Sequence, residues 1–412
     1  MDYVPAKAPV LMGHHFSSIA GAGPINGPIQ AAIFGWVPVL LWVLLGGIFF
    51  GAMHDFGALF ASIRHKGQSL GEVVALNIGD RAKKLFLIFS YLTLVLVVAA
   101  FASIVASTFV GFNADGSLNE TNASVAMISL LFIVMAVLFG FFVYRRGASL
   151  AVATIAGCVG IVICLLIGLN WHPIYLSNSV WMWIIGAYIL VASVAPVWIL
   201  LQPRDYLSSF LLYAMMVIAA VGVIGAGLTG ADAAHMDMPA FTGWYDNLAP
   251  TGNSLGYVFP ALFVTIACGA ISGFHSLVGS GTTAKQLDHE RDAKPIAYGG
   301  MLIECALALV SLCAVSFIWA EYASGEIVTP TQVFATGISR MVASIPGLAG
   351  AQGTIAALLV LTVSVFCLTS LDTATRLARY MFQEFWLKPG ETYKDATGIK
   401  AVLCLSLIHI SE

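Results

Sequence analysis

The chain has 412 residues, of which 59% are hydrophobic and 9% are charged, and its net charge is −3 at pH 7. Its mean hydropathy of +0.91 lies far above the range of globular proteins and excludes an ordinary water-soluble domain. The sequence contains no block of Lys and Arg of the kind that binds phosphates, so nucleic acid is not expected as a partner. These values indicate a protein that crosses a lipid bilayer several times.

Stretches of about 20 apolar residues are long enough to cross the hydrocarbon core of a bilayer as helices. We expect about ten such spans and an all-α fold, because the stretches lack the alternation of a barrel strand. The first stretch, at about 10–26, is short and is interrupted by glycine and proline. The others are expected at about 32–53, 85–110, 124–144, 148–169, 180–201, 208–230, 256–279, 296–320 and 353–380.

The positions of Lys and Arg indicate how the spans are oriented. Basic residues follow every second span, among them Arg64 after the second and Arg204 after the sixth. No Lys or Arg occurs in the segments 112–122, 170–179 and 231–254. Because cytoplasmic loops carry the excess of basic residues, we expect the even-numbered spans to end in the cytoplasm and the first span to run outward. Arg340, in the long 321–352 segment, is the exception.

Two polar, glycine-rich stretches resemble each other. The first is "GHHFSSIAGAGPI" at 13–25 and the second is "ISGFHSLVGSGTT" at 271–283, and in both a Gly-x-His precedes a Gly-x-Gly. By the charge pattern they run in opposite directions, as in transporters with inverted repeats, whose discontinuous helices meet near the middle of the membrane. Pairs of small residues also occur where two helices pack closely, which is the alternative role of each glycine pair.

The two stretches supply the candidate substrate-binding residues. We expect the helices to break at Gly21, Gly23 and Pro24 in the first and at Gly279 and Gly281 in the second, exposing backbone groups to a substrate. The candidates are His14, His15, Ser17, Ser18, Gly21 and Gly23 from the first stretch and Gly273, His275, Ser276, Gly279, Ser280, Gly281, Thr282 and Thr283 from the second. The alternatives are a buried structural histidine and a hydroxyl bonded to a carbonyl of its own helix.

Ionisable side chains are rare inside the expected spans. A charge in the hydrocarbon costs about 2.5–3.5 kcal/mol on insertion scales, so each one needs an explanation. Glu304 in the ninth span and Asp372 in the tenth are candidate proton carriers for ion coupling. The candidate oxygen ligands of a coupling ion are Thr369, Ser370 and Thr373. For Asp372 the alternative is an ion pair with Arg376, one helical turn later.

A metal site is the rival explanation of the histidines. Neighbouring histidines on a helix point about 100° apart, and no H-E-x-x-H motif or Cys/His cluster accompanies them, so no metal or other cofactor is expected. The 7 cysteines lie in apolar runs without a C-x-x-C pair and are predicted to fill the core rather than to form disulfides.

Several ordered segments resemble the carbon starvation protein A (CstA) family of bacterial inner-membrane transporters. They are "DYVPAKAPVLMGHHFSSIAGAGPINGP", "QPRDYLSSFL", "TIACGAISGFHSLVGSGTTAKQL", "AYGGMLIE" and "TSLDTATRLARYMFQE". The resemblance implies a multi-pass transporter, not an enzyme, that takes up peptides, or pyruvate with protons, during carbon starvation. It also implies the leucine-transporter-like inverted-repeat fold of the APC superfamily, with the first and eighth spans as the broken helices and "TSLDTATR" serving the coupling ion, a proton or sodium.

The resemblance has departures. Members of the family carry further hydrophobic helices on both sides of this stretch, so the chain is expected to be truncated at both ends. The two broken spans are seven helices apart, whereas a five-plus-five repeat would separate them by five. The transporter domain is expected at 1–401, and the tail 402–412, which ends in "LSLIHISE", is expected to be foreign. Two other classes stay open, namely a membrane sensor of nutrient state and an intramembrane metal-dependent hydrolase.

Overall fold

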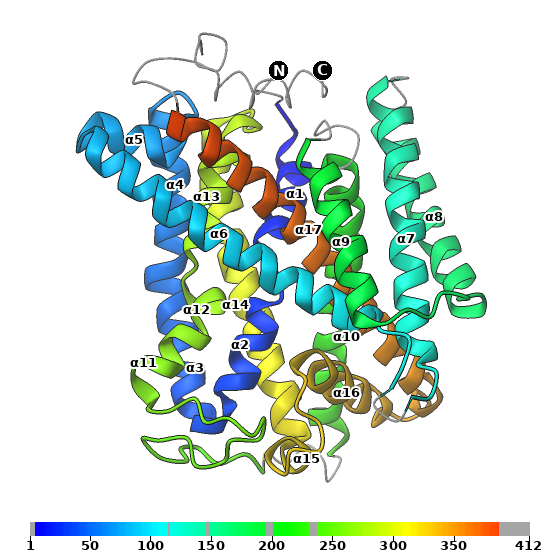
Figure 1. The fold of residues 1–412 in the computed structure, drawn as a ribbon. Helices are drawn as coiled ribbons and strands as arrows, with labels where there is room; N and C mark the ends of the chain where they lie inside the picture. The colour runs from blue at the N-terminus through cyan, green and yellow to red at the C-terminus, as the bar shows by residue number, and fades with distance from the viewer. Residues whose placement is uncertain (1–4, 114–115, 146–148, 195–200, 231–236, 387–412) are drawn as a thin grey trace.

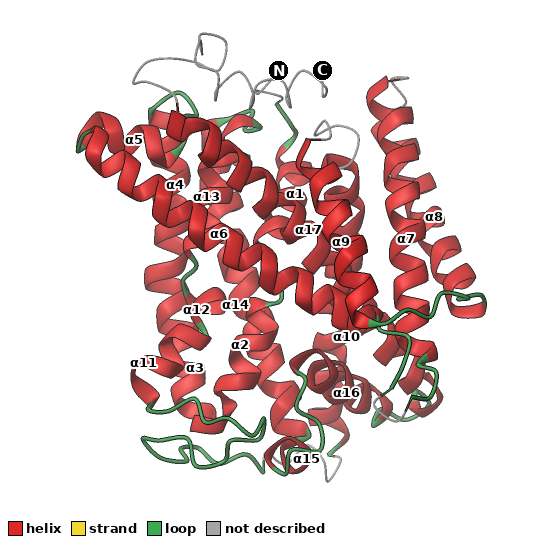
Figure 2. Cartoon of the chain, in the orientation of Figure 1, coloured by secondary structure: helices red, strands yellow, loops and turns green. Residues whose placement is uncertain are grey.

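The computed structural model describes residues 5–113, 116–145, 149–194, 201–230 and 237–386, and Figure 2 shows helices and loops throughout these ranges. The longer helices are α3 (Trp36–Leu45), which continues through a π-helical segment (Gly46–Gly51) into α4 (Ala52–Arg64), α6 (Asp80–Phe109), α7 (Glu120–Gly140), α8 (Leu150–Asn170), α9 (Asn178–Val194), α10 (Leu201–Thr229), α14 (Ala293–Phe317), α16 (Pro330–Ala343) and α17 (Gln352–Trp386). The shorter helices α5 (Leu70–Asn77) and α15 (Trp319–Ala323) lie near opposite ends of the molecule (Figure 1).

Seven helical segments in the described residues are long and apolar enough to cross a membrane, which confirms the expected all-α, multi-pass architecture. The expected count of about ten is not reached by this criterion. The sixth expected span corresponds to the shorter apolar helix α9, and the first and eighth spans are broken into pieces too short to count. The expected foreign tail, 402–412, lies outside the described residues.

The first expected span consists of two short helices, α1 (Ala8–Ile19) and α2 (Gly23–Ala31). Helix α1 ends at Ile19, and the next residue, Ala20, is non-helical, with φ −72° and ψ 70°. Pro24 then occupies the first turn of α2, where the missing N–H of proline does no harm. The expected break around Gly21 and Gly23 is therefore confirmed.

The eighth expected span is also discontinuous, but it breaks at a different place from the one predicted. It consists of α11 (Val258–Thr265), α12 (Ala267–Ala270) and α13 (Gly273–Gly281), and the chain is extended at Ile271 and Ser272. The predicted break at Gly279 is wrong, since Gly279 lies inside α13, whereas α13 does end at Gly281. Gly281 also allows close packing, because a Cβ there would collide with Leu377 of α17.

The two broken spans run in opposite directions, as predicted. In Figure 1, α1 and α2 descend from the end of the molecule that holds the N-terminus, whereas α11, α12 and α13 rise towards it. Both pack against the interior helices α14 and α17, in whose apolar segments 61% and 67% of the residues are buried, against 22% for α6. The breaks therefore lie inside the bundle.

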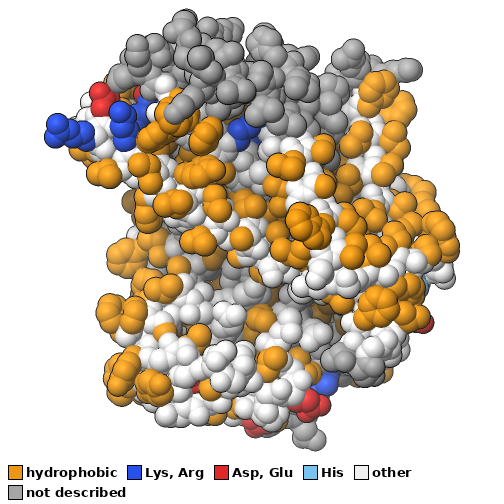
Figure 3. Space-filling model, in the orientation of Figure 1, with side chains coloured by type: hydrophobic (Ala, Val, Ile, Leu, Met, Phe, Trp, Pro, Cys, Tyr) orange, Lys and Arg blue, Asp and Glu red, His pale blue; other side chains and the backbone are white. Residues whose placement is uncertain are grey.

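The outer surface has the distribution of side chains that a membrane protein needs. Figure 3 shows hydrophobic side chains over the middle of the visible face, and Lys and Arg near its upper end, beside α5 and the start of α6. On α6, Leu85, Phe89 and Leu96 are about 70% exposed, which is favourable in lipid but not in water. We call the upper end the basic end.

The segment around Arg340 is helical and packed against the bundle. Helix α16 contacts α10, α14 and α17, and Arg340 lies in its last turn. Its guanidinium donates a hydrogen bond to Glu321 of α15 at 2.6 Å. The Arg340 guanidinium lowers the pKa of the Glu321 carboxyl through this bond. Arg340, the exception to the expected distribution of basic residues, is thus paired with the carboxylate of Glu321.

Candidate functional site

A buried cluster of charged groups surrounds His275 of α13. Its Nδ1 lies 2.9 Å from Oδ2 of Asp55 on α4, and its Nε2 lies 3.2 Å from Oε2 of Glu304 on α14. The three side chains are at most 1% exposed. Helix α13 packs on α4, and His275 lies near its start, so its imidazole reaches Asp55 of α4 with one nitrogen and Glu304 of α14 with the other.

Cys268 of α12 adds a thiol to the same cluster. Its Sγ lies 3.8 Å from Oε1 of Glu304, and one donor atom each from Cys268, His275 and Glu304 lies within 4.8 Å of the other two. A Cβ at Gly23 would collide with Cys268, so the start of α2 requires a glycine here. The thiol, imidazole and carboxylate form a donor set that suits a soft divalent cation as well as a proton.

His15 of α1 connects the two glycine-rich stretches. Its Nδ1 lies 2.8 Å from Oγ1 of Thr283, 268 residues away in the sequence. Its Nε2 is buried and has no hydrogen-bond partner in the described part of the chain. The expectation that the two stretches meet in space is therefore confirmed for this pair.

His14 forms a second polar group with residues that the sequence analysis did not single out. Its Nδ1 lies 2.8 Å from Oδ2 of Asp205 on α10, and the Nε2 atoms of His14 and Gln286 are 3.2 Å apart. The Ser18 hydroxyl donates to the same Asp205 carboxylate at 3.4 Å. The adjacent histidines thus point to separate partners, as the helical angle between them predicts.

A third polar group surrounds Asp372 of α17. Oδ2 of Asp372 forms an ion pair with Arg204 of α10 at 2.5 Å and accepts a hydrogen bond from the Tyr188 hydroxyl at 2.7 Å. Arg204 also donates to the Tyr188 hydroxyl, and to Thr369 at 3.2 Å. Asp372 therefore pairs with Arg204, which the sequence analysis treated as a loop residue and which is 1% exposed.

The hydroxyls of α17 adjoin the end of α1. Ser370 donates to the carbonyl of Ser18 at 3.3 Å, and the hydroxyls of Thr373 and Ser18 are 3.5 Å apart. A Cβ at Gly21 would lie 3.3 Å from Oγ of Ser370 and 2.6 Å from Phe101. The structure thus brings two of the three predicted ion-coupling hydroxyls, those of Ser370 and Thr373, to the predicted helix break, while Thr369 contacts Arg204.

Other predicted site residues bond within their own helix. Ser276, Ser280 and Thr282 donate to carbonyls three or four residues earlier, which is the alternative role considered for them. Ser17 donates to Gly13 at 2.6 Å and to the Asp205 carbonyl at 3.1 Å. Gly273 has no atom within 4 Å of an added Cβ.

Several residues of these polar groups were not predicted as site residues from the sequence: Asp55, Cys268, Arg204, Asp205 and Tyr188. Asp55 has the pattern of a residue at a solvated helix end, although it is 1% exposed. Arg204 and Asp205 occur together in "QPRDYLSSFL", and their adjacent opposite charges beside an apolar stretch were the available signal.

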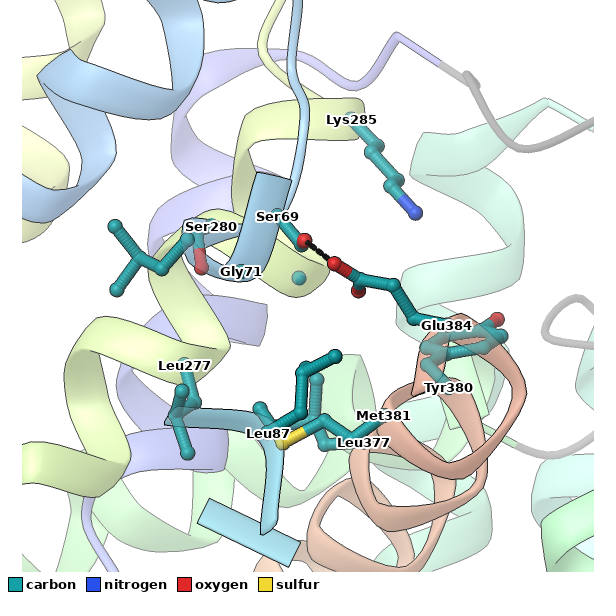
Figure 4. Close-up of a pocket in the computed structure, with 12 residues that line it drawn as sticks. Ser69, Gly71, Leu87, Leu277, Ser280, Lys285, Leu377, Tyr380, Met381 and Glu384 are labelled. Atoms are coloured by element: carbon teal, nitrogen blue, oxygen red, sulfur yellow. Dashed lines mark hydrogen bonds between the residues drawn. The ribbon is translucent and has the colours of Figure 1, made fainter. Parts of the chain in front are cut away.

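A pocket opens near the basic end, between α5, α13 and α17. Its empty space, open solvent included, is about 400 Å³. Figure 4 shows Ser69 and Glu384 facing each other across it, with a hydrogen bond of 2.7 Å, and Lys285 at its edge. Glu384 also lies 4.0 Å from Lys83 at the start of α6, so an ion pair connects α6 to the end of α17.

Discontinuous helices whose ends meet buried charges, within a bundle of membrane-spanning helices, define a multi-pass membrane protein with an interior polar site of the kind found in secondary transporters. The chain belongs to the family described as "Carbon starvation protein CstA", whose sequence profile matches residues 1–326 and 318–412. The resemblance found in the sequence is thus confirmed.

Named relatives support this assignment. The chain is 39% identical over 323 residues to the peptide transporter CstA of Campylobacter jejuni, an alignment that covers 76% of this chain and 43% of that protein. It is 38% identical over 329 residues to the peptide transporter CstA of Escherichia coli, covering 76% and 44%. It is 36% identical over 327 residues to the pyruvate/proton symporter BtsT of Escherichia coli, covering 77% and 43%. The chain therefore spans less than half the length of these three relatives.

Proposed function

We propose that this chain is the core of a secondary transporter that takes up peptides or small carboxylates such as pyruvate, coupled to protons, in the bacterial inner membrane during carbon starvation. The relatives' names supply the substrate classes and the proton. The observation that carries the proposal is the imidazole of His275, held between Asp55 and Glu304 where the broken spans meet the interior helices.

This arrangement suits a proton carrier because of its charge. With the imidazole protonated, two carboxylates share one positive charge, so one negative charge stays uncompensated in a buried place. One further proton neutralises the cluster, and a buried site favours neutrality because uncompensated charges there cost several kcal/mol. The cluster can therefore hold and release one proton while His275 keeps both neighbours.

We propose the leucine-transporter-like fold for the arrangement of the spans. Two discontinuous helices of opposite direction, both packed on α14 and α17, support it. In such folds the broken ends offer backbone groups to the substrate. Here the ends of α1 and α2 lie beside the hydroxyls of α17, and a substrate bound at this break would contact both.

The test is uptake of labelled pyruvate and a labelled dipeptide by cells that make the full-length protein. Uptake should collapse with a proton uncoupler and persist without sodium, and Glu304→Gln should abolish accumulation while the protein still inserts in the membrane. The matched control is Glu290→Gln, because the Glu290 side chain is 64% exposed. Saturable binding without accumulation would instead support a sensor of nutrient state.

A metal-dependent hydrolase is a second candidate, favoured by the donor set of Cys268, His275 and Glu304. The named relatives are transporters, which supports transport over hydrolysis. A stoichiometric metal in the purified protein, together with a hydrolytic activity that a chelator removes, would support the hydrolase.

A further inference from the structure

Arg204 has a guanidinium that is only partly used by its neighbours. One amino group binds Oδ2 of Asp372 and the Tyr188 hydroxyl, and the other binds Thr369. Nε of Arg204 and Oδ1 of Asp372 are buried without a hydrogen-bond partner in the described residues. Because a guanidinium can bind both oxygens of a carboxylate through two parallel bonds, this pair leaves half of that capacity unused.

The pair nevertheless has to stay neutral. Arg204 is 1% exposed and Asp372 is 2% exposed, so an unpaired charge on either would cost several kcal/mol. If Asp372 takes up a proton, Arg204 needs another anion. If another anion binds Arg204 first, it repels the Asp372 carboxylate and raises the affinity of that carboxylate for a proton. Proton and anion are therefore favoured together.

We propose that Arg204 binds the carboxylate of the transported substrate, and that Asp372 occupies its place when no substrate is bound. The incoming carboxylate displaces Asp372 from the guanidinium, and Asp372 takes up one proton from water, so the charge at the site is unchanged and no covalent bond is altered. This inference rests on the proposed function. It names the group that peptides and pyruvate share, a free carboxylate.

The surroundings favour a carboxylate here rather than at His275. The cluster of His275 already has two carboxylates for one imidazole and would repel a third. The charged and titratable groups that act on Asp372 are Arg204, Tyr188, Asp205 and Arg376. Of these, Asp205 is engaged by His14 at 2.8 Å. The Arg204 guanidinium and the Tyr188 hydroxyl, which both donate to the Asp372 carboxylate, thus remain as the donors for a substrate carboxylate that replaces it.

The position also fits the proposed substrate path. Asp372 lies between Ser370 and Thr373, whose hydroxyls contact Ser18 at the end of α1. A carboxylate on Arg204 would therefore place the rest of the molecule beside the helix break. Arg204, Tyr188 and Asp372 come from α10, α9 and α17, so exchanging one partner of the pair changes how three helices are held together.

The experiment measures binding of labelled pyruvate and its amide, pyruvamide, to the purified full-length protein between pH 5 and 8. Wild-type protein should bind pyruvate and not the amide, and its affinity should fall by about tenfold per pH unit above the titration of Asp372, since one proton enters with each carboxylate. Asp372→Asn should bind pyruvate more tightly, without this pH dependence. Arg204→Lys should weaken binding by about tenfold or more.

Arg204→Gln leaves Asp372 unpaired, so the folding control is the double variant Arg204→Gln/Asp372→Asn, which removes both charges. The double variant should fold and lose the preference for pyruvate over pyruvamide. The preference persisting in it, or the pH dependence persisting in Asp372→Asn, would overturn the inference and leave the proposed transport function intact. Wild-type protein that neither binds nor accumulates pyruvate or dipeptide would overturn both.

Discussion

Asp55 on α4 lies 2.9 Å from Nδ1 of His275 on α13, although the two residues are 220 positions apart in the sequence. Asp55 fixes which imidazole nitrogen faces Glu304, because the nitrogen bonded to Asp55 cannot turn towards α14. A carboxylate outside the two glycine-rich stretches thus orients His275 of the second stretch.

Asp55→Asn is expected to abolish proton-driven uptake, because it leaves a single carboxylate for the imidazolium of His275 and so removes the uncompensated negative charge that would take up the further proton. The measurement is uptake of labelled pyruvate or dipeptide at equal amounts of protein in the membrane. Asp288→Asn is the control, since the Asp288 side chain is 51% exposed and should tolerate the change. Full uptake by Asp55→Asn would exclude a coupling role for this pair.

Gly23→Ala is expected to destabilise the protein by about 1–3 kcal/mol, since the new methyl group collides with Cys268. Thermal unfolding of the purified protein measures the effect. Gly57→Ala in α4 is the control, because no atom lies within 4 Å of a Cβ there, and alanine is the better helix former by about 1 kcal/mol. Equal melting temperatures for Gly23→Ala and wild type would show that α2 and α12 are not packed this closely.

Metal removal tests the donor set at Cys268. We expect the purified protein to contain less than one metal ion per chain and uptake to be unaffected by a chelator, because His275 and Glu304 already lie within ion-pair distance of each other, at 3.2 Å. Metal analysis and uptake after chelation provide the two measurements. One tightly bound ion that Cys268→Ser removes and Cys313→Ser retains would speak for a metal centre.

The Arg340 and Glu321 pair predicts a small stabilisation that depends on pH. Arg340 lowers the pKa of Glu321, so the pair stabilises the folded state above the unfolded pKa of Glu321 and loses this effect as the pH falls through the folded pKa. Both side chains are partly exposed, at 38% and 28%, so the effect should stay below about 1 kcal/mol.

The check on this pair is the difference in melting temperature between wild type and Arg340→Gln. That difference should be present at pH 7 and shrink towards pH 4. A difference that stays constant over this range would mean that Arg340 acts through packing in α16 rather than through Glu321.

The sequence allowed the membrane class, most of the spans and the first helix break to be predicted, because these depend on local properties. A span is recognised from the hydropathy of its own residues, and Gly21, Gly23 and Pro24 weaken a helix wherever it lies. The second break was misplaced because Gly279 lies inside α13 and Gly281 serves close packing on Leu377, which no local pattern reveals.

By itself, then, the sequence determined that this is an all-helical membrane protein with two glycine-rich, oppositely directed stretches. Only the tertiary structure decided which buried charges are partners: Asp372 with Arg204, His14 with Asp205, and His275 with both Asp55 and Glu304. The physical reason is that a buried charge needs a neutralising group within a few ångströms, and in this chain that group comes from a different helix. Which helices adjoin is set by the packing of the whole bundle.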